Sequence, residues 1–293
     1  GELAGYYGEF TFFMLEVRGI NAFAVPGGFI GVHSGLLLES KSESEVASVL
    51  AHEIVHITQR HTARMIEAQK RTSIPAMAAL LGAVALMVVN PEAGIGAVTA
   101  VQAINAQRQI NFTRANEKEA DRIGIQLLHE AGYNPHAMAD FFERLQTASR
   151  YTDPAFIPEI LRTHPVTVNR ISEAKERAER LSGGPVREDS YEYHLIRTKL
   201  DVRAASDPGQ AKRYYELALR EGTSVHSSIA RYGYVLALTA ASDFSKARIE
   251  IAKLLLESPD ILAFRLAAAR LELRAGDVPA ALEHFALAYR ADP

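Results

Sequence analysis

The sequence contains no cysteine and no tryptophan among its 293 residues. The absence of cysteine excludes thiol nucleophiles, thiolate zinc sites, iron–sulfur ligation and disulfide bonds. The net charge of −3 excludes the strong positive field that nucleic-acid binding requires, so no nucleic-acid partner is predicted. Ten histidines are present, and any metal site must therefore be built from His, Asp and Glu side chains.

The chain does not open on a basic segment followed by an apolar one, so no signal peptide is predicted within it. A length of 293 residues is long for one hydrophobic core and sufficient for two domains. Hydrophobic residues make up 48% of the chain and charged residues 23%, which is typical of folded proteins rather than disordered ones.

The longest apolar run covers residues 74–89, and a second stretch, rich in small residues, covers 94–106. Asn90, Pro91 and Glu92 separate the two, which predicts a hairpin of two apolar helices over 74–106. The first run is shorter than the roughly 20 residues that span a bilayer. Two interpretations stay open: a pair of buried core helices, or a surface that touches a membrane or covers a cleft.

Hydrophobic periodicity predicts a mixture of strands and helices in the first 185 residues. Strands are predicted over 10–17, 21–25 and 29–33, with a turn at Pro26-Gly27-Gly28 between the last two. Helices are predicted over 42–71, 114–131, 135–149 and 165–181. Ser42 and Glu45 have capping-box spacing at the start of the first helix.

Ser182-Gly183-Gly184-Pro185 is the strongest linker candidate, so the domain boundary is placed after residue 185. Beyond it the pattern is helical and contains an internal repeat. The segment 243–247 aligns with 277–281 at an offset of 34 residues, the tetratricopeptide period. Three helix pairs are predicted over 186–293. Because such arrays need a polar cap, we expect the natural protein to continue beyond this repeat.

The segment from His52 to His56 is an H-E-x-x-H motif inside the first predicted helix. Histidines at i and i+4 lie on one helical face, one turn apart, so both can bind one zinc ion. Glu53 lies beside them, within reach of a metal-bound water. The alternative is an ordinary helix with two polar-facing histidines, because a motif this short also occurs by chance.

The third metal ligand is predicted on the helix that contains Glu117 and Asp121. These residues share a face, which suits a Glu that binds zinc and an Asp that accepts a hydrogen bond from a zinc-binding His. Glu119 is predicted to point elsewhere. His61 is rejected as a ligand because on a straight helix it lies about half a revolution from His52. The alternative for this helix is an acidic, solvated face.

His164-Pro165, followed by Arg170, is the third group of candidate site residues. Pro165 suits the first turn of a helix, which would place His164 at the N-terminus of that helix. Three roles for His164 stay open. It is a donor to a developing oxyanion, a fourth zinc ligand in a resting state, or a structural capping residue.

These motifs together resemble those of the BepA/YfgC-like periplasmic metalloproteases, which belong to the gluzincin group with the HtpX and CAAX-prenyl proteases. The resemblance rests on H-E-I-V-H at 52–56, E-K-E-A-D-R-I-G at 117–124, T-H-P-V-T-V-N-R at 163–170 and the repeats that follow. Segments 21–24 and 31–36 also match. The resemblance covers nearly the whole chain, residues 10–293.

The resemblance implies one Zn²⁺ ion bound by His52, His56 and Glu117. It implies that Glu53 is the general base and that Asp121 supports the ligands from behind.

The resemblance also places His164 and Arg170 in the active site. It implies that the strand containing Asn21, Ala22 and Phe23 edges the cleft and pairs with the backbone of the substrate.

The predicted fold class is α+β. A mostly helical, zincin-type metalloprotease domain with a small β-sheet covers residues 1–185, and an all-α tetratricopeptide solenoid covers 186–293. The predicted function is a zinc endopeptidase that acts on misfolded or stalled outer-membrane proteins in the periplasm of a Gram-negative bacterium. A partner from the outer-membrane assembly machinery is expected on the repeat groove, and peripheral membrane contact through 74–106. The alternative is a latent protease that acts mainly as a chaperone-like interaction module.

Overall fold

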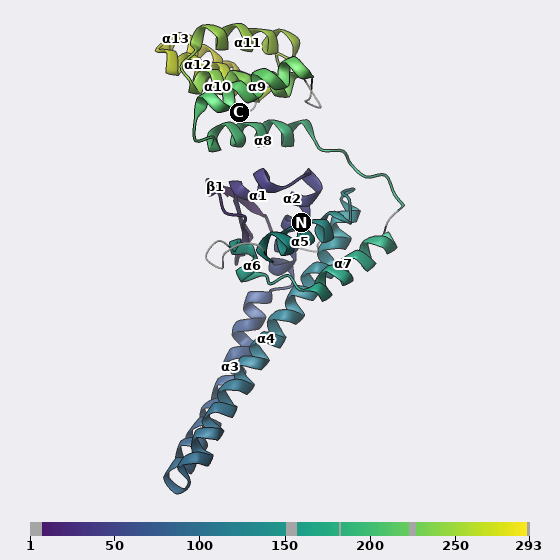
Figure 1. Cartoon of the computed structure of the whole chain (residues 1–293), viewed down its shortest axis with the longest axis vertical. Coiled ribbons are helices and arrows are strands. Elements are labelled where there is room, and N and C mark those ends of the chain that lie inside the picture. Colours follow the sequence, from purple (N-terminus) through teal and green to yellow (C-terminus); the bar gives the residue numbers. More distant parts are fainter. Residues whose placement is uncertain (1–7, 151–156, 182, 223–226, 292–293) are drawn as a thin grey trace. The chain divides into compact units, whose positions relative to one another are not determined.

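The computed structural model describes residues 8–150, 157–181, 183–222 and 227–291 (Figure 1). The chain divides into two compact units, Gly1–Glu188 and Asp189–Pro293. The boundary predicted after residue 185 lies close to this division.

A small mixed sheet opens the first unit. It contains β1 (Thr11–Leu15), β2 (Ala22–Val25) and β3 (Phe29–His33) in the order β1-β3-β2, with β1 parallel and β2 antiparallel to β3. All three strands lie within the predicted ranges. Gly27 and Gly28 have φ angles of 103° and 91° in the turn between β2 and β3. This left-handed conformation favours glycine, as the Pro-Gly-Gly signal predicts.

Seven helices follow in the described part of the first unit: α1 (Ser34–Glu39), α2 (Glu43–Thr58), α3 (His61–Val89), α4 (Pro91–Glu130), α5 (Ala137–Arg150), α6 (Glu159–Thr163) and α7 (Val168–Leu181). α2 packs between the sheet, α4 and α5, and α7 packs on α4 and α5. The largest fully buried side chains of this unit include Ile30, Leu36, Val55, Ile125, Leu128, Met138 and Phe141. The first unit thus has the predicted α+β class.

The prediction of one helix over 42–71 is wrong, because the chain changes direction between α2 and α3. α2 begins after Ser42, whose Oγ accepts a hydrogen bond from the backbone N–H of Glu45 at 3.3 Å, as the capping spacing predicts. It ends at Thr58, and Arg60 then adopts a left-handed φ of 52°. A left-handed non-glycine residue leaves no trace in hydrophobic periodicity, so the pattern alone does not show this break.

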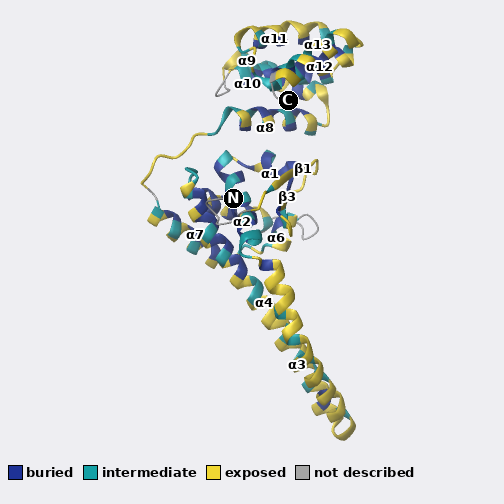
Figure 2. Cartoon of the chain, turned by 180° about the vertical axis from the view of Figure 1, so that it is seen from behind, coloured by how far each residue is buried: buried dark blue, intermediate teal, exposed yellow. Residues whose placement is uncertain are grey.

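The predicted apolar hairpin is present, but it is longer than predicted. α3 continues through Pro75, and α4 runs for 40 residues, so that 94–106 and 114–131 belong to one helix. The two helices pack on each other and project away from the rest of the unit (Figure 1). Most residues along the projecting part are exposed (Figure 2). The interpretation as two buried core helices is therefore wrong, since only 6% of the most apolar window of α3 is buried.

The helix predicted to open at Pro165 begins later, at Val168. His164 is instead the residue at which α6 ends, and its backbone N–H donates to Ile160 O at 2.8 Å. Thr167 lies before α7, where its Oγ1 accepts a hydrogen bond from the backbone N–H of Arg170 at 3.3 Å. The predicted position of His164 at the N-terminus of a helix is therefore wrong, and this residue lies in a loop between two helices.

The described part of the second unit consists of six helices of 14 residues each: α8 (Tyr191–Ala204), α9 (Pro208–Glu221), α10 (Ser227–Ala240), α11 (Phe244–Glu257), α12 (Leu262–Ala275) and α13 (Val278–Ala291). Each helix from α9 onward packs on the next one, and α10 also packs on α8 and α12. The core of this unit includes Tyr215, Tyr232, Leu238, Leu254, Phe264 and Leu271.

The 34-residue offset of the sequence recurs in the backbone of the second unit. Ser242 and Gly276 have left-handed φ angles of 60° and 87°, in the turns after α10 and α12. Ala247 and Ala281, in the first turns of α11 and α13, are both fully buried, with exposed fractions of 0% and 1%. The sequence repeat therefore corresponds to a repeated helix–turn–helix unit.

The close crossing of α2 and α4 depends on Gly124, and this gives a stability prediction. A Cβ atom at Gly124 would lie 3.3 Å from His52 N and 3.2 Å from Met138 Cε. We expect Gly124→Val to lower the free energy of unfolding of the first unit by about 1–3 kcal/mol, because the added methyl groups overpack this crossing. Thermal unfolding followed by circular dichroism measures the effect.

Gly96→Val is the matched control, since Gly96 lies in the same helix and a Cβ there would meet nothing within 4 Å. It should not destabilise the protein. Equal melting temperatures for the two variants would contradict the role given to Gly124.

Candidate metal centre

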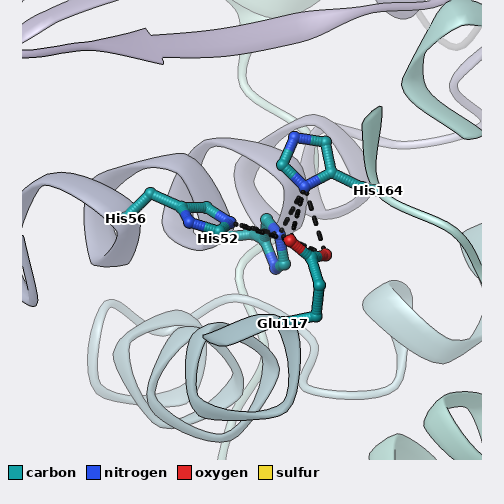
Figure 3. Close-up of side chains that lie close together, drawn as sticks. All are labelled: His52, His56, Glu117 and His164. Carbon is teal, nitrogen blue, oxygen red and sulfur yellow. Dashed lines mark hydrogen bonds and ion pairs between the residues drawn. The ribbon is translucent and has the colours of Figure 1, made fainter. Parts of the chain in front are cut away.

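The two histidines of the H-E-x-x-H motif lie one turn apart on α2 and point to the same place (Figure 3). His52 is buried, with 5% of its surface exposed. The Nε2 atoms of His52 and His56 are 2.9 Å apart. At this distance only one of the two nitrogens can carry a hydrogen, so at least one lone pair faces the space between the rings.

Glu117, from α4, and His164, from the loop after α6, complete the group. Glu117 Oε2 lies 3.4 Å from His52 Nε2, and Glu117 Oε1 lies 3.5 Å from His56 Nε2. His164 Nδ1 lies 3.0 Å from Glu117 Oε1 and 3.4 Å from His52 Nε2. The four side chains thus converge from three separate segments of the chain (Figure 3).

The donor atoms of this group are close enough together to hold a single metal ion. Each residue offers one nitrogen or oxygen atom, and all four atoms lie within 4.8 Å of one another. Ligand atoms on a tetrahedral zinc ion with bonds of about 2.0–2.1 Å are about 3.3 Å apart. The separations given above, 2.9–3.5 Å when both oxygens of Glu117 are included, lie close to this value. Imidazole nitrogens and a carboxylate oxygen are also donor types that zinc prefers.

Burial and neighbouring charges shift the pKa values of three of these side chains. Burial disfavours the charged form of His52, but hydrogen bonds to Asp121 and Glu117 outweigh it and raise the pKa of His52 to about 10. Burial and the positive charge of His52 lower the pKa of His56 to about 2. Burial opposes ionisation of Glu117, yet hydrogen bonds to His164 and His52 hold its pKa well below the usual range. A neutral His56 and an ionised Glu117 are the forms that bind a cation, whereas His52 must release its proton when it binds one.

Asp121 and Arg170 form a buried ion pair behind these four side chains. Asp121 Oδ1 lies 3.0 Å from His52 Nδ1. Arg170 donates from Nε and Nη2 to the two oxygens of Asp121, each at 2.7 Å. Its Nη1 lies 2.9 Å from Glu117 Oε2 and donates to Pro165 O at 2.9 Å. One guanidinium group thus connects α4 and α7 with the loop that follows α6.

Glu53 lies beside the group and is 2% exposed. Its carboxylate accepts a hydrogen bond from the backbone N–H of Ala24 in β2, and burial raises its pKa. Glu53 Oε1 lies 3.4 Å from His164 Nε2, and no described residue donates a hydrogen bond to it. A buried carboxylate oxygen that lacks a donor is suited to accept a proton from water or substrate.

The predicted substrate-binding residues lie at or in the edge strand β2, next to Glu53. They are Asn21, Ala22 and Phe23. The backbone O of Asn21 accepts a hydrogen bond from His33 N at 3.0 Å, so Asn21 and Phe23 direct their backbone groups toward β3. Because neighbouring residues of a strand alternate, the backbone groups of Ala22 and Ala24 face the outer edge of the sheet.

Comparison with known proteins decides the family. The family model for peptidase family M48 matches residues 5–178, which is more than half of the chain. The chain belongs to peptidase family M48. A candidate β-barrel assembly-enhancing protease of Vibrio cholerae is 43% identical over 253 residues, covering 86% of this chain and 51% of that protein. The β-barrel assembly-enhancing protease of Escherichia coli is 37% identical over 250 residues, covering 85% of this chain and 51% of that protein.

A more distant relative is the mitochondrial metalloendopeptidase OMA1 of Schizosaccharomyces pombe. It is 31% identical over 156 residues, which cover 53% of this chain and 43% of that protein. The chain spans about half the length of the β-barrel assembly-enhancing proteases it matches. The candidate metal-binding group, formed by His52, His56, Glu117 and His164, lies inside the region that the family model matches.

A cleft of about 620 Å³ lies beside the metal-binding group of the M48 domain. One wall is the segment of α4 from Ala106 to Lys118, which includes Glu117. The other wall is the segment from Pro165 to Arg170. Its size is within the range of ligand-binding sites in proteins.

A second set of contacts behind His56 was not predicted. Because the chain turns at Arg60, His61 folds back and its Nδ1 lies 2.9 Å from His56 Nδ1. His61 Nε2 lies 3.2 Å from Glu119 Oε2, which also accepts a hydrogen bond from Arg64 Nη1 at 2.9 Å. His61 and Glu119 thus lie outside the four-residue group and contact one of its members from behind. Such contacts fix the tautomer and orientation of a ligand histidine.

The two glutamates of α4 give the first test of this site. We expect Glu117→Gln to weaken zinc binding strongly, because it removes the only carboxylate in the described group. Glu119→Gln should retain most of the zinc, because Glu119 contacts His61 and Arg64 instead. Isothermal titration with zinc measures both affinities. Full retention in Glu117→Gln combined with loss in Glu119→Gln would overturn the assignment.

His61 gives a second prediction. His61→Ala should weaken zinc binding by about 10–100-fold, the usual cost of removing a partner of a ligand histidine. His136→Ala, which changes a histidine outside the site, is the control and should leave the affinity unchanged. An unchanged zinc affinity in His61→Ala would show that the contact with His56 does not orient it.

Proposed function

We propose that the M48 domain is a zinc endopeptidase in which His52, His56 and Glu117 hold one Zn²⁺ ion and Glu53 is the general base. The convergence of the three donor side chains beside the buried carboxylate of Glu53 supports this most directly. Two histidines and one glutamate are a donor set that zinc takes in hydrolytic enzymes.

The residues of the chain account for the proton transfers of peptide hydrolysis. When bound, zinc polarises the peptide carbonyl and lowers the pKa of a bound water to about 7. Glu53, whose pKa is raised by burial, removes a proton from the attacking water as the water oxygen adds to the carbonyl carbon. It then passes this proton to the departing amide nitrogen. Asp121 orients the ring of His52 through the contact at Nδ1.

The substrate is proposed to bind as an extended strand along the outer edge of β2. Main-chain pairing at a sheet edge suits many sequences and fixes the direction of the peptide. Of the predicted residues Asn21, Ala22 and Phe23, only Ala22 directs its backbone outward, and Ala24 continues the edge toward Glu53. We therefore assign the pairing to the backbone N–H and C=O of Ala22 and to the C=O of Ala24, because the N–H of Ala24 already donates to Glu53. Asn21 and Phe23 support the strand.

His164 and Arg170 receive separate roles in this proposal. Arg170 is a positioning residue, because it is 4% exposed and contacts Asp121 and Glu117 from behind. His164 is the most exposed of the four side chains, at 16%, and its Nε2 lies 3.4 Å from Glu53 Oε1. From there it can donate to the oxyanion that develops during hydrolysis.

A second candidate function rests on the position of His164. Its Nδ1 lies within the same group as the three proposed ligands, 3.0 Å from Glu117 Oε1. As a fourth ligand it would remove the open coordination position that hydrolysis requires. The protease would then be latent, and the chain would act mainly as a chaperone-like or assembly-factor interaction module.

Residues 186–293 are proposed to form a tetratricopeptide solenoid that binds a protein partner, following a protease domain over 1–185. The recurrence of turn conformations 34 residues apart, at Ser242 and Gly276, supports the repeat. Stacked repeats of this kind expose extended surfaces for partner binding.

The names of the relatives suggest the biological setting. Two of them are named for enhancing β-barrel assembly. We propose that the substrates are misfolded or stalled outer-membrane proteins. The proposed partner is the outer-membrane assembly machinery, and the proposed location is the periplasm of a Gram-negative bacterium.

Substitution of the proposed base tests the mechanism. Glu53→Gln should keep zinc bound, because Glu53 is not among the ligands, and should lower casein hydrolysis by at least about 100-fold. Zinc content and peptide release are measured on the same preparation. Unchanged hydrolysis by zinc-loaded Glu53→Gln would refute the proposed role.

His164→Ala separates the two candidate functions. If His164 holds the enzyme latent, the zinc-loaded variant should cleave casein faster than the unsubstituted chain. If His164 stabilises the oxyanion, the variant should be slower. Absence of cleavage in both proteins, with zinc bound in both, would favour the interaction module over the endopeptidase.

A further inference from the structure

The distal arm, defined as residues 74–106, comprises the end of α3, the turn at Asn90 and the first part of α4. It contains a single charged residue, Glu92, which lies next to the turn. We infer that the distal arm inserts into a lipid bilayer, with the outward face of α3 among the acyl chains. The following observations support a lipid partner.

The outward face of α3 is apolar without interruption. Ala76, Leu80, Ala83 and Met87 form the stripe that is covered, and every other residue from 74 to 89 is exposed and apolar. Its large exposed side chains are Ile74 (78%), Met77 (58%), Leu81 (62%), Val84 (48%), Leu86 (40%), Val88 (86%) and Val89 (84%). Soluble monomers rarely leave so large a contiguous apolar surface in water.

The distribution of these side chains favours lipid over a protein groove. A groove or a partner helix covers one stripe of a helix, whereas residues 74–89 of α3 are apolar on all sides and only the side facing α4 is covered. Among the described helices, α3 is the one that is long and apolar enough to cross a membrane, with a mean hydropathy of 2.1 over its most apolar window. Residues 74–89 extend over about 24 Å, against a hydrocarbon core of about 30 Å.

α4 differs from α3 along the same arm. Its exposed positions include the polar residues Thr99 and Gln102 as well as Ile95 and Ile104. α3 is therefore the helix that meets the acyl chains, and α4 lies closer to the headgroups. This asymmetry is typical of helices that lie in one side of a bilayer rather than spanning it.

Basic residues border the distal arm where it joins the rest of the unit. Lys70 and Arg71 precede it on α3, and Arg108 and Arg114 follow it on α4; all four are exposed. The acidic residue Glu67 pairs with Arg71. The net positive charge at this position matches the negative headgroups of an anionic bilayer, and the long basic side chains reach the headgroup level.

The insertion places the metal-binding group near the membrane surface. Arg108 and Glu117 are nine residues apart on the same helix, which corresponds to a rise of about 14 Å. If the domain is the proposed endopeptidase, this position would direct hydrolysis to polypeptide segments close to a bilayer. This is the only step of the inference that rests on the proposed function.

The absence of tryptophan makes insertion directly measurable in the full chain. Leu81→Trp places a single reporter on the outward face of α3. With vesicles of phosphatidylethanolamine and phosphatidylglycerol, we expect its emission to shift to shorter wavelength and to be quenched by lipids brominated in the acyl chains. Gln102→Trp on α4 should be quenched less, and Tyr289→Trp in the second unit should not respond.

Two matched double variants test whether the distal arm causes vesicle binding. Leu81→Asp with Val88→Asp should lower partition into vesicles by at least about tenfold, because aspartate is costly in the bilayer. Leu256→Asp with Leu282→Asp makes the same charge change at exposed leucines of the second unit and should leave partition unchanged. All four residues are exposed, so both variants should keep the circular dichroism spectrum of the unsubstituted chain.

Replacement of the basic border tests the headgroup contact. Lys70→Gln and Arg108→Gln should each weaken binding to phosphatidylglycerol-containing vesicles by about fivefold and leave binding to phosphatidylcholine vesicles unchanged.

Three results would overturn the inference. The first is that the unsubstituted chain does not partition into any vesicle. The second is that the two double variants partition equally. The third is a wavelength shift of the residue-81 reporter that grows with protein concentration in the absence of lipid. The last result would identify a second copy of the chain as the partner. Casein hydrolysis in solution should be the same for both double variants, so that failure of the proposed protease activity remains distinguishable.

Discussion

The buried ion pair between Arg170 and Asp121 is the interaction on which the arrangement of the metal-binding group depends. Removing a charged group from water costs several kcal/mol, and the cost is offset only when the polar atoms of that group are paired. Here Nε and Nη2 of Arg170 bind Asp121, Nη1 binds Glu117 and the carbonyl of Pro165, and the guanidinium lies 4.9 Å from the centre of the Phe142 ring. These contacts together hold α4, α7 and the loop after α6 in one placement. The same placement brings the proposed ligands into contact.

α4 contributes to two different parts of the first unit along one helix. In its second half, residues Glu117, Asp121 and Gly124 recur at helical spacing and are packed against α2 and α7. In its first half nearly every residue is exposed except those that face α3. The two helices of the arm approach closely because small residues lie between them: a Cβ atom at Gly94 would come within 2.3 Å of Met87 Cγ. A helix of 40 residues is far longer than the core it contributes to, and its apolar first half is therefore not explained by the stability of the domain.

Much of the site was predictable because it is encoded locally. The pairs His52–His56 and Glu117–Asp121 follow from spacing on a helix, and the strands follow from alternation and a Pro-Gly-Gly turn. What could not be predicted depends on single backbone angles or on distant contacts. The left-handed conformation of Arg60 ends α2 and brings His61 to His56, and no local pattern specifies it. The loop position of His164 depends on Arg170 binding the carbonyl of Pro165, which is a tertiary contact. The hydropathy of the sequence predicts the apolar hairpin but does not indicate which surface or molecule covers it.

The connection between the distal arm and the metal-binding group has a mechanical consequence. The segment of α4 from Arg108 to Glu117 contains neither glycine nor proline and is helical throughout, so it does not offer a hinge. The surface that covers the arm therefore fixes the distance and the tilt of Glu117 relative to that surface. It also fixes the orientation of the β2 edge beside Glu53. A flexible tether would only raise the local concentration of a substrate, whereas a rigid helix also selects the direction from which a substrate strand can approach. Under the proposed function and the inferred membrane contact, the selectivity of this domain would be set partly by the surface on which the arm rests, and not only by the residues that line the cleft.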